Sequence, residues 1–329
     1  MPDRTSVTVV MPTRNRPVLA AQAIDSALNQ PGADMHVVVV DDASDEDVVQ
    51  ALKELASDRV TLVQNPERSG ACVSRNRGLA AVETPWVAFL DDDDLAAPGR
   101  YPKLVSAIDN AHGEWGFASV VYVDGKLEVL GIAEAPPSEG LAQRLLSANA
   151  IPGGGSALVA RTDLVRAVGG MRPGMLGVED WDLALRLARE VPAVSLNDVL
   201  LAYRVQLQSH SHRADVIEQV HGLFTEAWQD ERRAAALPEH DRDVELYMAR
   251  QWLHNANRLK AAKRFASVAV HYRQPKWLVH AAIALAAPNA LEEASTKRWR
   301  ARVPATTMAE IERWLRPYRT LPTPTRITN

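Results

Sequence analysis

The first ninety residues alternate short apolar runs with amphipathic helical segments, and this alternation limits the folds that the chain can adopt. Strands are predicted at residues 7–11, 35–40, 60–63 and 86–90, and helices at 17–29, from 44 or 45 onward, and at 71–82. The strands are apolar almost throughout, which is typical of strands covered on both faces. The sequence therefore predicts an α/β fold, with a mainly parallel sheet between helices.

Four consecutive carboxylates, Asp91, Asp92, Asp93 and Asp94, directly follow the apolar run at residues 86–90. The carboxyl edge of an open α/β sheet is where ligands bind. Adjacent carboxylates repel one another unless a cation compensates them, and oxygen clusters suit Mg²⁺ or Mn²⁺. We therefore predict a divalent-cation site for a phosphorylated ligand, with a solvated acidic turn as the alternative.

Composition excludes several classes of protein. The chain has 329 residues and a net charge of −4, so it carries no global signal for nucleic-acid binding. One cysteine, Cys72, rules out an internal disulfide framework and fits a reducing compartment. We find no signal-peptide pattern at the N-terminus and no apolar run long enough to span a bilayer. A cytoplasmic location, with contact to the inner face of the membrane as an option, is the expectation.

Two common nucleotide-binding motifs are missing from the sequence. No Gly-x-Gly-x-x-Gly follows the first strand, and no Gly-Lys-Ser/Thr occurs anywhere. The loop after the first strand also has no glycine, which argues against a sugar nucleotidyltransferase. A nucleotide would instead be held by side chains at the strand ends, where carboxylates accept hydrogen bonds from base or ribose and arginine pairs with phosphate.

Five segments, in this order and at these spacings, resemble the family 2 glycosyltransferases of GT-A fold. They lie at residues 10–16 (VMPTRNR), 39–44 (VVDDAS), 70–78 (GACVSRNRG), 89–94 (FLDDDD) and 177–186 (GVEDWDLALR). The resemblance covers about residues 5–205. It implies a Rossmann-like sheet covered by helices, and an inverting transfer of a sugar from a nucleotide donor with a divalent metal.

The resemblance also implies roles for individual residues. Asp93 and Asp91 would bind Mn²⁺ or Mg²⁺. UDP-sugar is favoured as the donor over thymidine and guanosine forms, because of the family's habit and because Asp41 or Asp42 would face the base. The residues expected to contact the nucleotide are Pro12, Thr13, Arg14, Arg16, Asp41, Asp42, Arg75, Asp91 and Asp92.

The pair Glu179-Asp180 begins a predicted amphipathic helix. A carboxylate at a helix N-terminus is stabilised as an anion, so simple charge placement is one interpretation. The family match favours catalysis, with Asp180 as the base that takes the acceptor proton. Trp181 is expected either to stack on an acceptor sugar or to lie in the core. Only one of His210 and His212 can reach the metal from an extended chain, and we take His210 as the candidate.

From about residue 213 the sequence becomes helical, with predicted helices at 213–236, 242–272 and 275–287 and breaks at Pro238, Pro275 and Pro288. We divide the chain into a catalytic domain (1–212), a C-terminal helical region (213–320) and a loosely ordered tail (321–329). Residues 277–287 are apolar and 297–319 are basic, so helix packing and contact with an anionic membrane both remain open.

The partners follow from the same resemblance. A nucleotide-sugar donor and a saccharide, lipid-linked or small-molecule acceptor are expected, and the oligomeric state is not predicted. A non-catalytic nucleotide-sugar-binding protein is the alternative function. The intact groups at Asp91, Asp93 and Asp180 favour an enzyme, because a binding protein has no need of a base.

Overall fold

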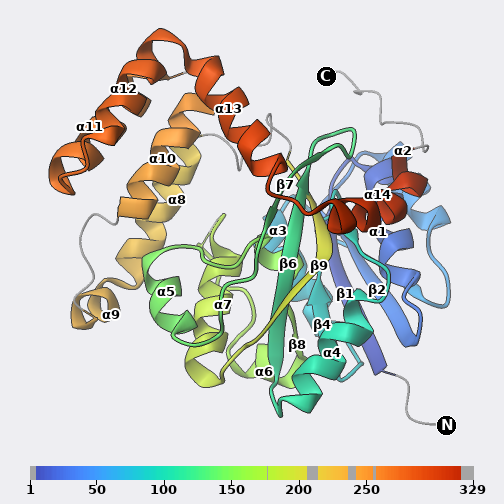
Figure 1. Ribbon diagram of the computed structural model, residues 1–329. Coiled ribbons are helices and arrows are strands. Elements are labelled where there is room, and N and C mark those ends of the chain that lie inside the picture. The colour runs from blue at the N-terminus through green and yellow to red at the C-terminus, as the bar shows by residue number, and fades with distance from the viewer. Residues whose placement is uncertain (1–4, 176, 206–213, 236–241, 255–256, 320–329) are drawn as a thin grey trace.

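A computed structural model describes residues 5–175, 177–205, 214–235, 242–254 and 257–319 (Figure 1). One nine-stranded sheet crosses the N-terminal part of the chain, predicted above as the catalytic domain, in the order β3-β2-β1-β4-β8-β6-β9-β5, with β7 added beside β6. The four predicted strands are present as β1 (Thr5–Thr13), β2 (Ala33–Asp41), β3 (Val60–Gln64) and β4 (Trp86–Phe89). All pairs among these four are parallel, so the predicted α/β architecture is confirmed.

The second half of the sheet mixes strand directions. Its strands are β5 (Leu95–Ala96), β6 (Trp115–Val123), β7 (Val129–Ala133), β8 (Val159–Arg161) and β9 (Val194–Arg204). β8 runs antiparallel to both β4 and β6, whereas β6 and β9 are parallel. At β8 the strand direction reverses, so the second half of the sheet does not follow the regular β-α order. The carboxyl ends of β1, β2 and β4 lie open to a ligand.

Helices cover both faces of the sheet. In the catalytic domain they are α1 (Pro17–Leu28), α2 (Glu46–Glu54), α3 (Gly70–Ala80), α4 (Arg100–Asn110), α5 (Leu141–Ser147), the short 3₁₀ helix η1 (Gly154–Ala157), α6 (Thr162–Ala167) and α7 (Glu179–Glu190). Gly78 lets α3 approach β1 closely, because a Cβ at this position would lie 2.4 Å from the Val10 Cγ1 atom. This contact fixes the helix that carries Arg75 against the strand that carries Thr13.

The C-terminal region is helical, as predicted. Its helices are α8 (Ala214–Ala227), α9 (Gln229–Ala234), α10 (Arg242–His254), α11 (Arg258–His271), α12 (Lys276–Ala286), α13 (Pro288–Arg300) and α14 (Ala305–Arg319). The helix predicted at 242–272 is two helices, and Asn257 caps the second by accepting the Lys260 N–H at 3.1 Å. Pro288 begins α13, a position where its missing N–H costs nothing.

Helices α8, α13 and α14 pack against the domain that contains the sheet. Phe224 of α8 stacks on Trp181 of α7. The Trp299 indole of α13 lies against Gly131 of β7 and donates to the Ile132 carbonyl. In α14, Ile311 packs into a cluster with β5, β6 and β9. Among the described residues the chain is helical from Ala214 onward, and α10–α12 form a further hydrophobic cluster against which Leu291 of α13 packs.

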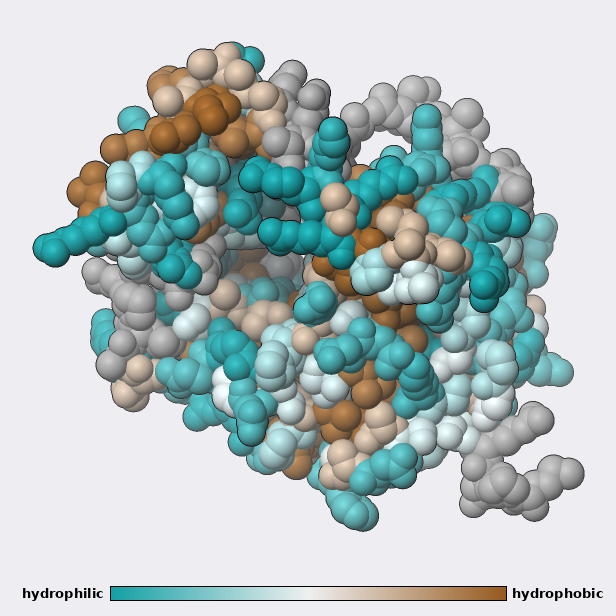
Figure 2. Space-filling view, in the orientation of Figure 1, coloured by the Kyte–Doolittle hydropathy of each residue, from teal (hydrophilic) through white to brown (hydrophobic). Residues whose placement is uncertain are grey.

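The surface reflects this division. Figure 2 shows a mixed, largely hydrophilic surface over the catalytic domain and a concentration of hydrophobic residues over α11 and α12. In the part of the chain that the structure describes, no helix is both long and apolar enough to cross a bilayer.

Candidate functional site

A cleft of about 340 Å³ opens at the carboxyl ends of β1, β2 and β4, where the sequence places its polar residues. It is lined by Pro12, Thr13, Arg14, Arg16, Asp42, Arg68, Ala71, Ser74, Arg75, Asp91, Asp92, Asp93, Tyr203 and Arg204. Eight of the nine predicted nucleotide contacts are in this set. The exception is Asp41, which is buried behind the cleft wall.

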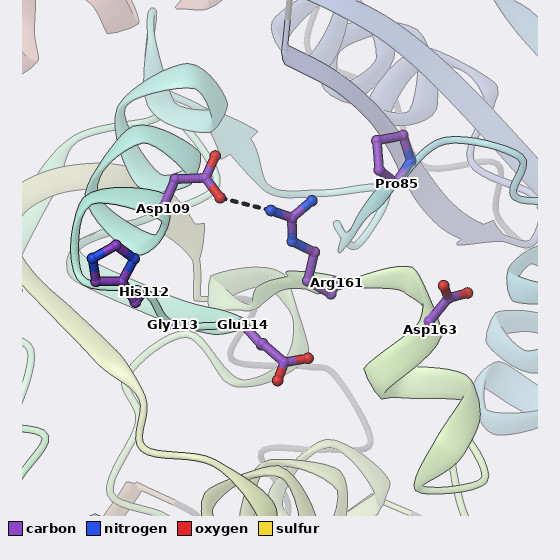
Figure 3. Close-up of a pocket in the computed structure, with 7 residues that line it drawn as sticks. All are labelled: Pro85, Asp109, His112, Gly113, Glu114, Arg161 and Asp163. Carbon is purple, nitrogen blue, oxygen red and sulfur yellow. Dashed lines mark hydrogen bonds and ion pairs between the residues drawn. The ribbon is translucent and has the colours of Figure 1, made fainter.

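A larger depression of about 480 Å³ lies at the opposite edge of the sheet, beside the starts of β4 and β6 (Figure 3). Arg161 and Asp109 form an ion pair across it at 2.7 Å. None of the predicted site residues lines it. We therefore place the candidate site in the cleft at the carboxyl ends of β1, β2 and β4.

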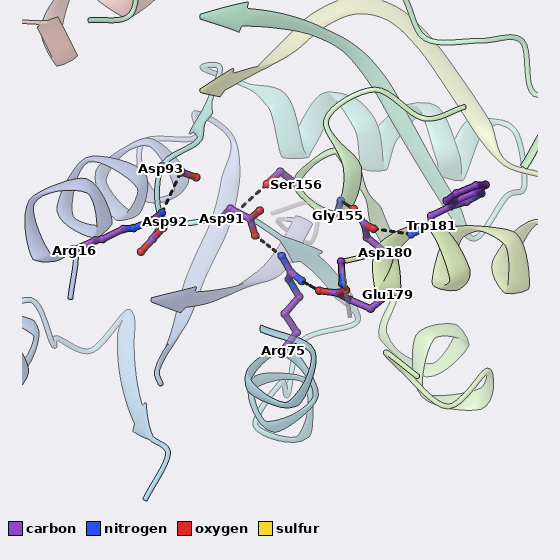
Figure 4. Close-up of polar contacts among 11 residues, drawn as sticks. Arg16, Arg75, Asp91, Asp92, Asp93, Gly155, Ser156, Glu179, Asp180 and Trp181 are labelled. Carbon is purple, nitrogen blue, oxygen red and sulfur yellow. Dashed lines mark hydrogen bonds and ion pairs between the residues drawn. The ribbon is translucent and has the colours of Figure 1, made fainter. Parts of the chain in front are cut away.

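The acidic run at the end of β4 is held by β1 and the loop that follows it. Thr13 Oγ1 donates to Asp92 Oδ2 at 2.7 Å. The Arg16 guanidinium donates to both Asp92 and Asp93 at 3.1 Å (Figure 4). Burial, together with the charges of Asp92 and Asp91, raises the pKa of Asp93 to about 7. The charges of Arg16 and Arg204 lower this pKa but do not outweigh the burial and the neighbouring carboxylates.

These carboxylates have the chemistry of a divalent-cation site. Hard oxygen ligands suit Mg²⁺ and Mn²⁺, and a dication would relieve the repulsion that raises the Asp93 pKa. The ligand geometry itself is not formed, because among the described residues no three His, Cys, Asp or Glu side chains converge. His210 and His212 lie outside the described residues.

Arg75 of α3 connects the acidic run to the helix that begins at Glu179. Its guanidinium pairs with Asp91 Oδ1 at 2.5 Å and with Glu179 Oε1 at 2.9 Å, and its side chain is only 7% exposed. The charges of the surrounding carboxylates outweigh burial and raise the Arg75 pKa. The Asp91 N–H donates to Ser156 Oγ at 2.9 Å. A continuous polar network thus joins β4, α3, η1 and α7 (Figure 4).

Asp180 lies at the start of α7, next to this network. Its Oδ2 accepts the Gly155 N–H at 2.8 Å and its Oδ1 accepts the Trp181 N–H at 2.7 Å. Burial, followed by the charge of Glu179, raises the pKa of Asp180 to about 6. The residue remains partly accessible. It is therefore a carboxylate that is ionised near neutral pH and readily protonated, as a general base requires.

Glu179 is buried and has a different environment. Its Oε1 is paired with Arg75, and its Oε2 accepts the Gly177 N–H at 2.6 Å. Both oxygens therefore hold the entrance to α7 in place. The two adjacent carboxylates differ in that Glu179 forms an ion pair with the Arg75 guanidinium, whereas Asp180 accepts hydrogen bonds only from backbone N–H groups among the described residues.

Asp41 and Asp42 also differ from each other. Asp42 accepts hydrogen bonds from the Asn65 side chain at 2.8 Å and from the N–H groups of Ser69 and Gly70 at 2.7 and 2.9 Å. Burial raises the pKa of Asp42, but these donors outweigh it and the net pKa is lowered. Asp41 has an Oδ2 atom that is buried without a hydrogen-bond partner among the described residues. Of the two, Asp42 is the one at the cleft.

Two alternatives were open for Trp181, and the structure favours a place in the core. Trp181 is 4% exposed, its indole N–H donates to the Leu145 carbonyl at 2.6 Å, and its ring stacks on Phe224 with centroids 3.6 Å apart. A ring covered in this way favours the core alternative over stacking on an acceptor sugar. The α8 helix covers its ring.

Several residues of the site were not singled out by sequence reasoning. Arg68 and Tyr203 line the cleft. Arg204, at the end of β9, donates from its N–H to Asp94 Oδ1 and from Nε to the Asp93 carbonyl, both at 2.9 Å. Position could have indicated Tyr203 and Arg204, because they lie at the end of a strand, as several other site residues do. The backbone of Gly154 and Gly155 also lies against Asp180.

A mixed sheet with an acidic run after its fourth strand and a carboxylate pair at a helix start defines the GT-A class of nucleotide-sugar-binding folds. Staphylococcus aureus TarS 1–349 with UDP-GlcNAc has this fold at a TM-score of 0.53 and 18% identity, covering 82% of this chain and 92% of that one. The mannosyltransferase PcManGT of Pyrobaculum calidifontis with GDP-Man and Mn²⁺ matches at 0.53 and 21%, covering 94% of this chain and 86% of that one.

Sequence comparison supplies the family. Residues 8–165 match the profile of glycosyl transferase family 2. An uncharacterized glycosyltransferase of Haemophilus influenzae is 28% identical over 190 residues, 56% of this chain and 62% of that protein. A GalNAc(5)-diNAcBac-PP-undecaprenol beta-1,3-glucosyltransferase of Campylobacter jejuni is 32% identical over 109 residues, 32% of this chain and 35% of that protein. Residues 8–165, just under half of the chain, therefore match the family 2 glycosyltransferases, and the chain as a whole has the GT-A fold.

Proposed function

We propose that the protein is an inverting glycosyltransferase that moves a sugar from a nucleoside diphosphate to an acceptor hydroxyl. The observation that carries the proposal is the network from Asp91 through Arg75 to Glu179, which sets Asp180 beside the nucleotide cleft. It brings a phosphate-binding region and a carboxylate with a pKa of about 6 into one site. A protein that only binds nucleotide sugars needs the first of these and has no use for the second.

The donor would lie along the ends of β1, β2 and β4. Thr13, Asp42 and Arg75 are at the wall where a base and ribose would find hydrogen-bond partners. Arg14, Arg16 and Arg68 are the cations available to a diphosphate. We favour a uridine nucleotide on the family's habit, and the UDP-GlcNAc complex of TarS shows such a donor on the same fold.

The metal would be held by Asp93 and Asp91, which the Mn²⁺ complex of PcManGT supports only by analogy of fold. When bound, Mn²⁺ or Mg²⁺ would stabilise the negative charge of the departing diphosphate. Arg16 now pairs with Asp93, so we expect this guanidinium to turn toward the diphosphate when the cation is bound.

Asp180 would act as the base of a single displacement. The acceptor hydroxyl gives its proton to an Asp180 oxygen while its own oxygen bonds to the anomeric carbon from the face opposite the leaving group. The bond between that carbon and the diphosphate oxygen breaks, and its electron pair leaves with the nucleoside diphosphate. One displacement inverts the anomeric configuration. Glu179 and Arg75 hold the helix start that positions Asp180.

The acceptor is a saccharide, a lipid-linked saccharide or a small molecule with a hydroxyl. Relatives named for colanic acid and succinoglycan biosynthesis and for an undecaprenol-linked saccharide make a glycan intermediate the first class to test. The matched segments span 62%, 37% and 35% of the first three relatives, so the acceptor of none of them transfers directly.

Thermal shift with UDP, TDP and GDP, each with and without Mn²⁺, tests the donor, because a ligand that binds the folded state raises the melting temperature. UDP should give the largest shift, and Mn²⁺ should enlarge it. Transfer to a panel of glycan acceptors, with the anomeric configuration of the product read by NMR, tests the reaction. Nucleotide binding with no transfer or donor hydrolysis would favour the non-catalytic alternative.

A further inference from the structure

The helical hairpin formed by α11 and α12 stands at the far end of the C-terminal region from the sheet (Figure 1). Its inner faces already make a closed core. Phe265 stacks on Trp277 with ring centroids 6.0 Å apart, and Ala261, Val268 and Ala284 are buried between the helices. The hairpin therefore needs nothing on its outer side to be complete.

That outer side is nonetheless apolar. Leu278, Val279 and Leu285 of α12 are 51%, 58% and 46% exposed. Leu278 and Leu285, seven residues apart, lie one above the other, and Val279 is about 100° away around the helix, so the exposed apolar surface covers roughly a third of its circumference. Val270 at the end of α11 is 73% exposed. Figure 2 shows hydrophobic residues gathered over this hairpin, whereas the visible surface of the catalytic domain is mixed.

The charge of the hairpin has a single sign. From residue 257 to 291 the chain contains no aspartate and no glutamate. It contains six basic residues, which are Arg258, Lys260, Lys263, Arg264, Arg273 and Lys276. All except Arg264 are exposed. The whole chain is acidic at −4, so this positive segment is a local feature and not a consequence of composition.

We propose that the α11–α12 hairpin is a docking surface for an anionic lipid bilayer. The exposed apolar face of α12 enters the boundary between headgroups and acyl chains, and the surrounding lysines and arginines pair with lipid phosphates. Apolar contact alone would equally suit a second copy of the chain, but two like-charged hairpins would repel each other. The complete lack of acidic residues in this segment selects an anionic surface as the partner.

The inference does not depend on the proposed reaction, since none of the hairpin residues lines the cleft. Membrane binding would also account for the exposed apolar and basic residues of the hairpin, which the packing of the C-terminal region does not explain. An enzyme held at a membrane by this hairpin would meet acceptors that are anchored there.

Flotation of the full chain with lipid vesicles tests the proposal. Vesicles of phosphatidylcholine with about 30% phosphatidylglycerol should carry the protein, while pure phosphatidylcholine vesicles should not. Salt at about 0.5 M should weaken this binding, because it screens the basic residues. The double variant Val279→Glu with Leu285→Glu should lose at least about tenfold in vesicle affinity, since both changes put charge on the apolar face.

A matched control changes the net charge equally at another place. Gln50→Glu with Lys53→Gln lies on exposed positions of α2, also lowers the net charge by two, and should float as the wild type does. Equal loss in both variants would mean that net charge alone drives binding and would overturn the proposal. So would a wild-type chain that does not float with anionic vesicles, or a dimer by light scattering that Val279→Glu with Leu285→Glu converts to monomer. Donor binding in the absence of lipid should be the same in all of them, which separates this test from that of the proposed reaction.

Discussion

The backbone N–H of Gly155 donates to Asp180 Oδ2 at 2.8 Å, so a loop of three glycines aims the proposed base. The neighbouring Gly154 has φ +52°, and a Cβ there would lie 2.3 Å from the same Asp180 oxygen. The loop and the carboxylate therefore fit each other only while residue 154 has no side chain.

Gly154→Ala should displace the Asp180 carboxylate and lower kcat by about tenfold or more, since small misplacements of a catalytic group cost large factors. Nucleotide affinity should change little, because Thr13 and Arg16 are untouched. Steady-state kinetics and nucleotide titration measure the two effects. Gly174→Ala is the matched control, with φ +87° and no atom within 4 Å of the added Cβ. If the control loses as much kcat, backbone strain and not the contact with Asp180 is responsible.

Asp180→Asn should leave donor binding nearly intact and lower kcat by roughly 10²–10⁴, the range for loss of a general base. Asparagine keeps the size of the side chain but has a single acceptor oxygen, so it can keep only one of the hydrogen bonds from the Gly155 and Trp181 N–H groups, and it cannot take a proton. Glu179→Gln should cost less in kcat, and it should weaken donor binding through Arg75. A product of retained configuration, or near-normal turnover of Asp180→Asn, would remove Asp180 from the role of base.

The pH dependence of kcat follows from the same residue. Only ionised Asp180 accepts a proton, and its pKa is raised to about 6. Activity should therefore be nearly constant above pH 7 and fall below pH 6, to about a tenth of the plateau at pH 5. A kcat profile in the presence of saturating donor measures this limb. A limb near pH 4, where an unshifted aspartate titrates, would contradict the burial of Asp180.

Local sequence signals predicted the first half of the fold well. The strands and helices up to residue 90 agree with prediction to within a few residues, because hydrophobic period and strand-end polarity are local properties. β6 and β8 were not predicted, since their pairing depends on partners far along the chain. The cleft residues were found because parallel strands end at one edge.

The sequence could not show which side chains contact one another in the folded protein. Arg75 and Glu179 are 104 positions apart, and their ion pair exists only in the folded chain. Trp181 directly follows the carboxylate pair, and nothing local distinguishes a tryptophan facing a cleft from one covered by a later helix. Phe224, which covers it, lies in a part of the chain that the family resemblance does not reach.

The burial of Trp181 has its own test. Trp181→Phe removes the indole N–H from the Leu145 carbonyl and leaves that buried acceptor unpaired. We expect the free energy of unfolding to fall by about 1–3 kcal/mol. The KM for the acceptor should stay within about twofold, since the ring does not reach the cleft. Urea denaturation and acceptor kinetics give the two values. A large rise in acceptor KM with unchanged stability would restore the stacking role.

Asp93→Asn tests the metal site in two independent ways. Asparagine keeps the shape but removes a ligand charge, so metal-dependent nucleotide binding should weaken at least about tenfold, or about 1.4 kcal/mol. Calorimetry with and without Mn²⁺ measures this. Asp109→Asn, in the depression at the opposite edge of the sheet, is the control and should bind as the wild type does.

The second readout of Asp93→Asn is the stability of the metal-free protein. The folded pKa of Asp93, about 7, is above its unfolded value, so the folded state holds this proton more tightly. Its contribution to stability is complete below about pH 4 and is lost as the pH rises through 7. The asparagine side chain of the variant cannot ionise, so its stability lacks this pH dependence. In EDTA, the free energy of unfolding of the variant minus that of the wild type should therefore be larger at pH 8 than at pH 5, by on the order of 1–3 kcal/mol. Mn²⁺ should stabilise the wild type and not the variant. Equal pH dependence of the two melting curves, together with unchanged metal-dependent affinity, would mean that Asp93 neither has the raised pKa nor binds the cation.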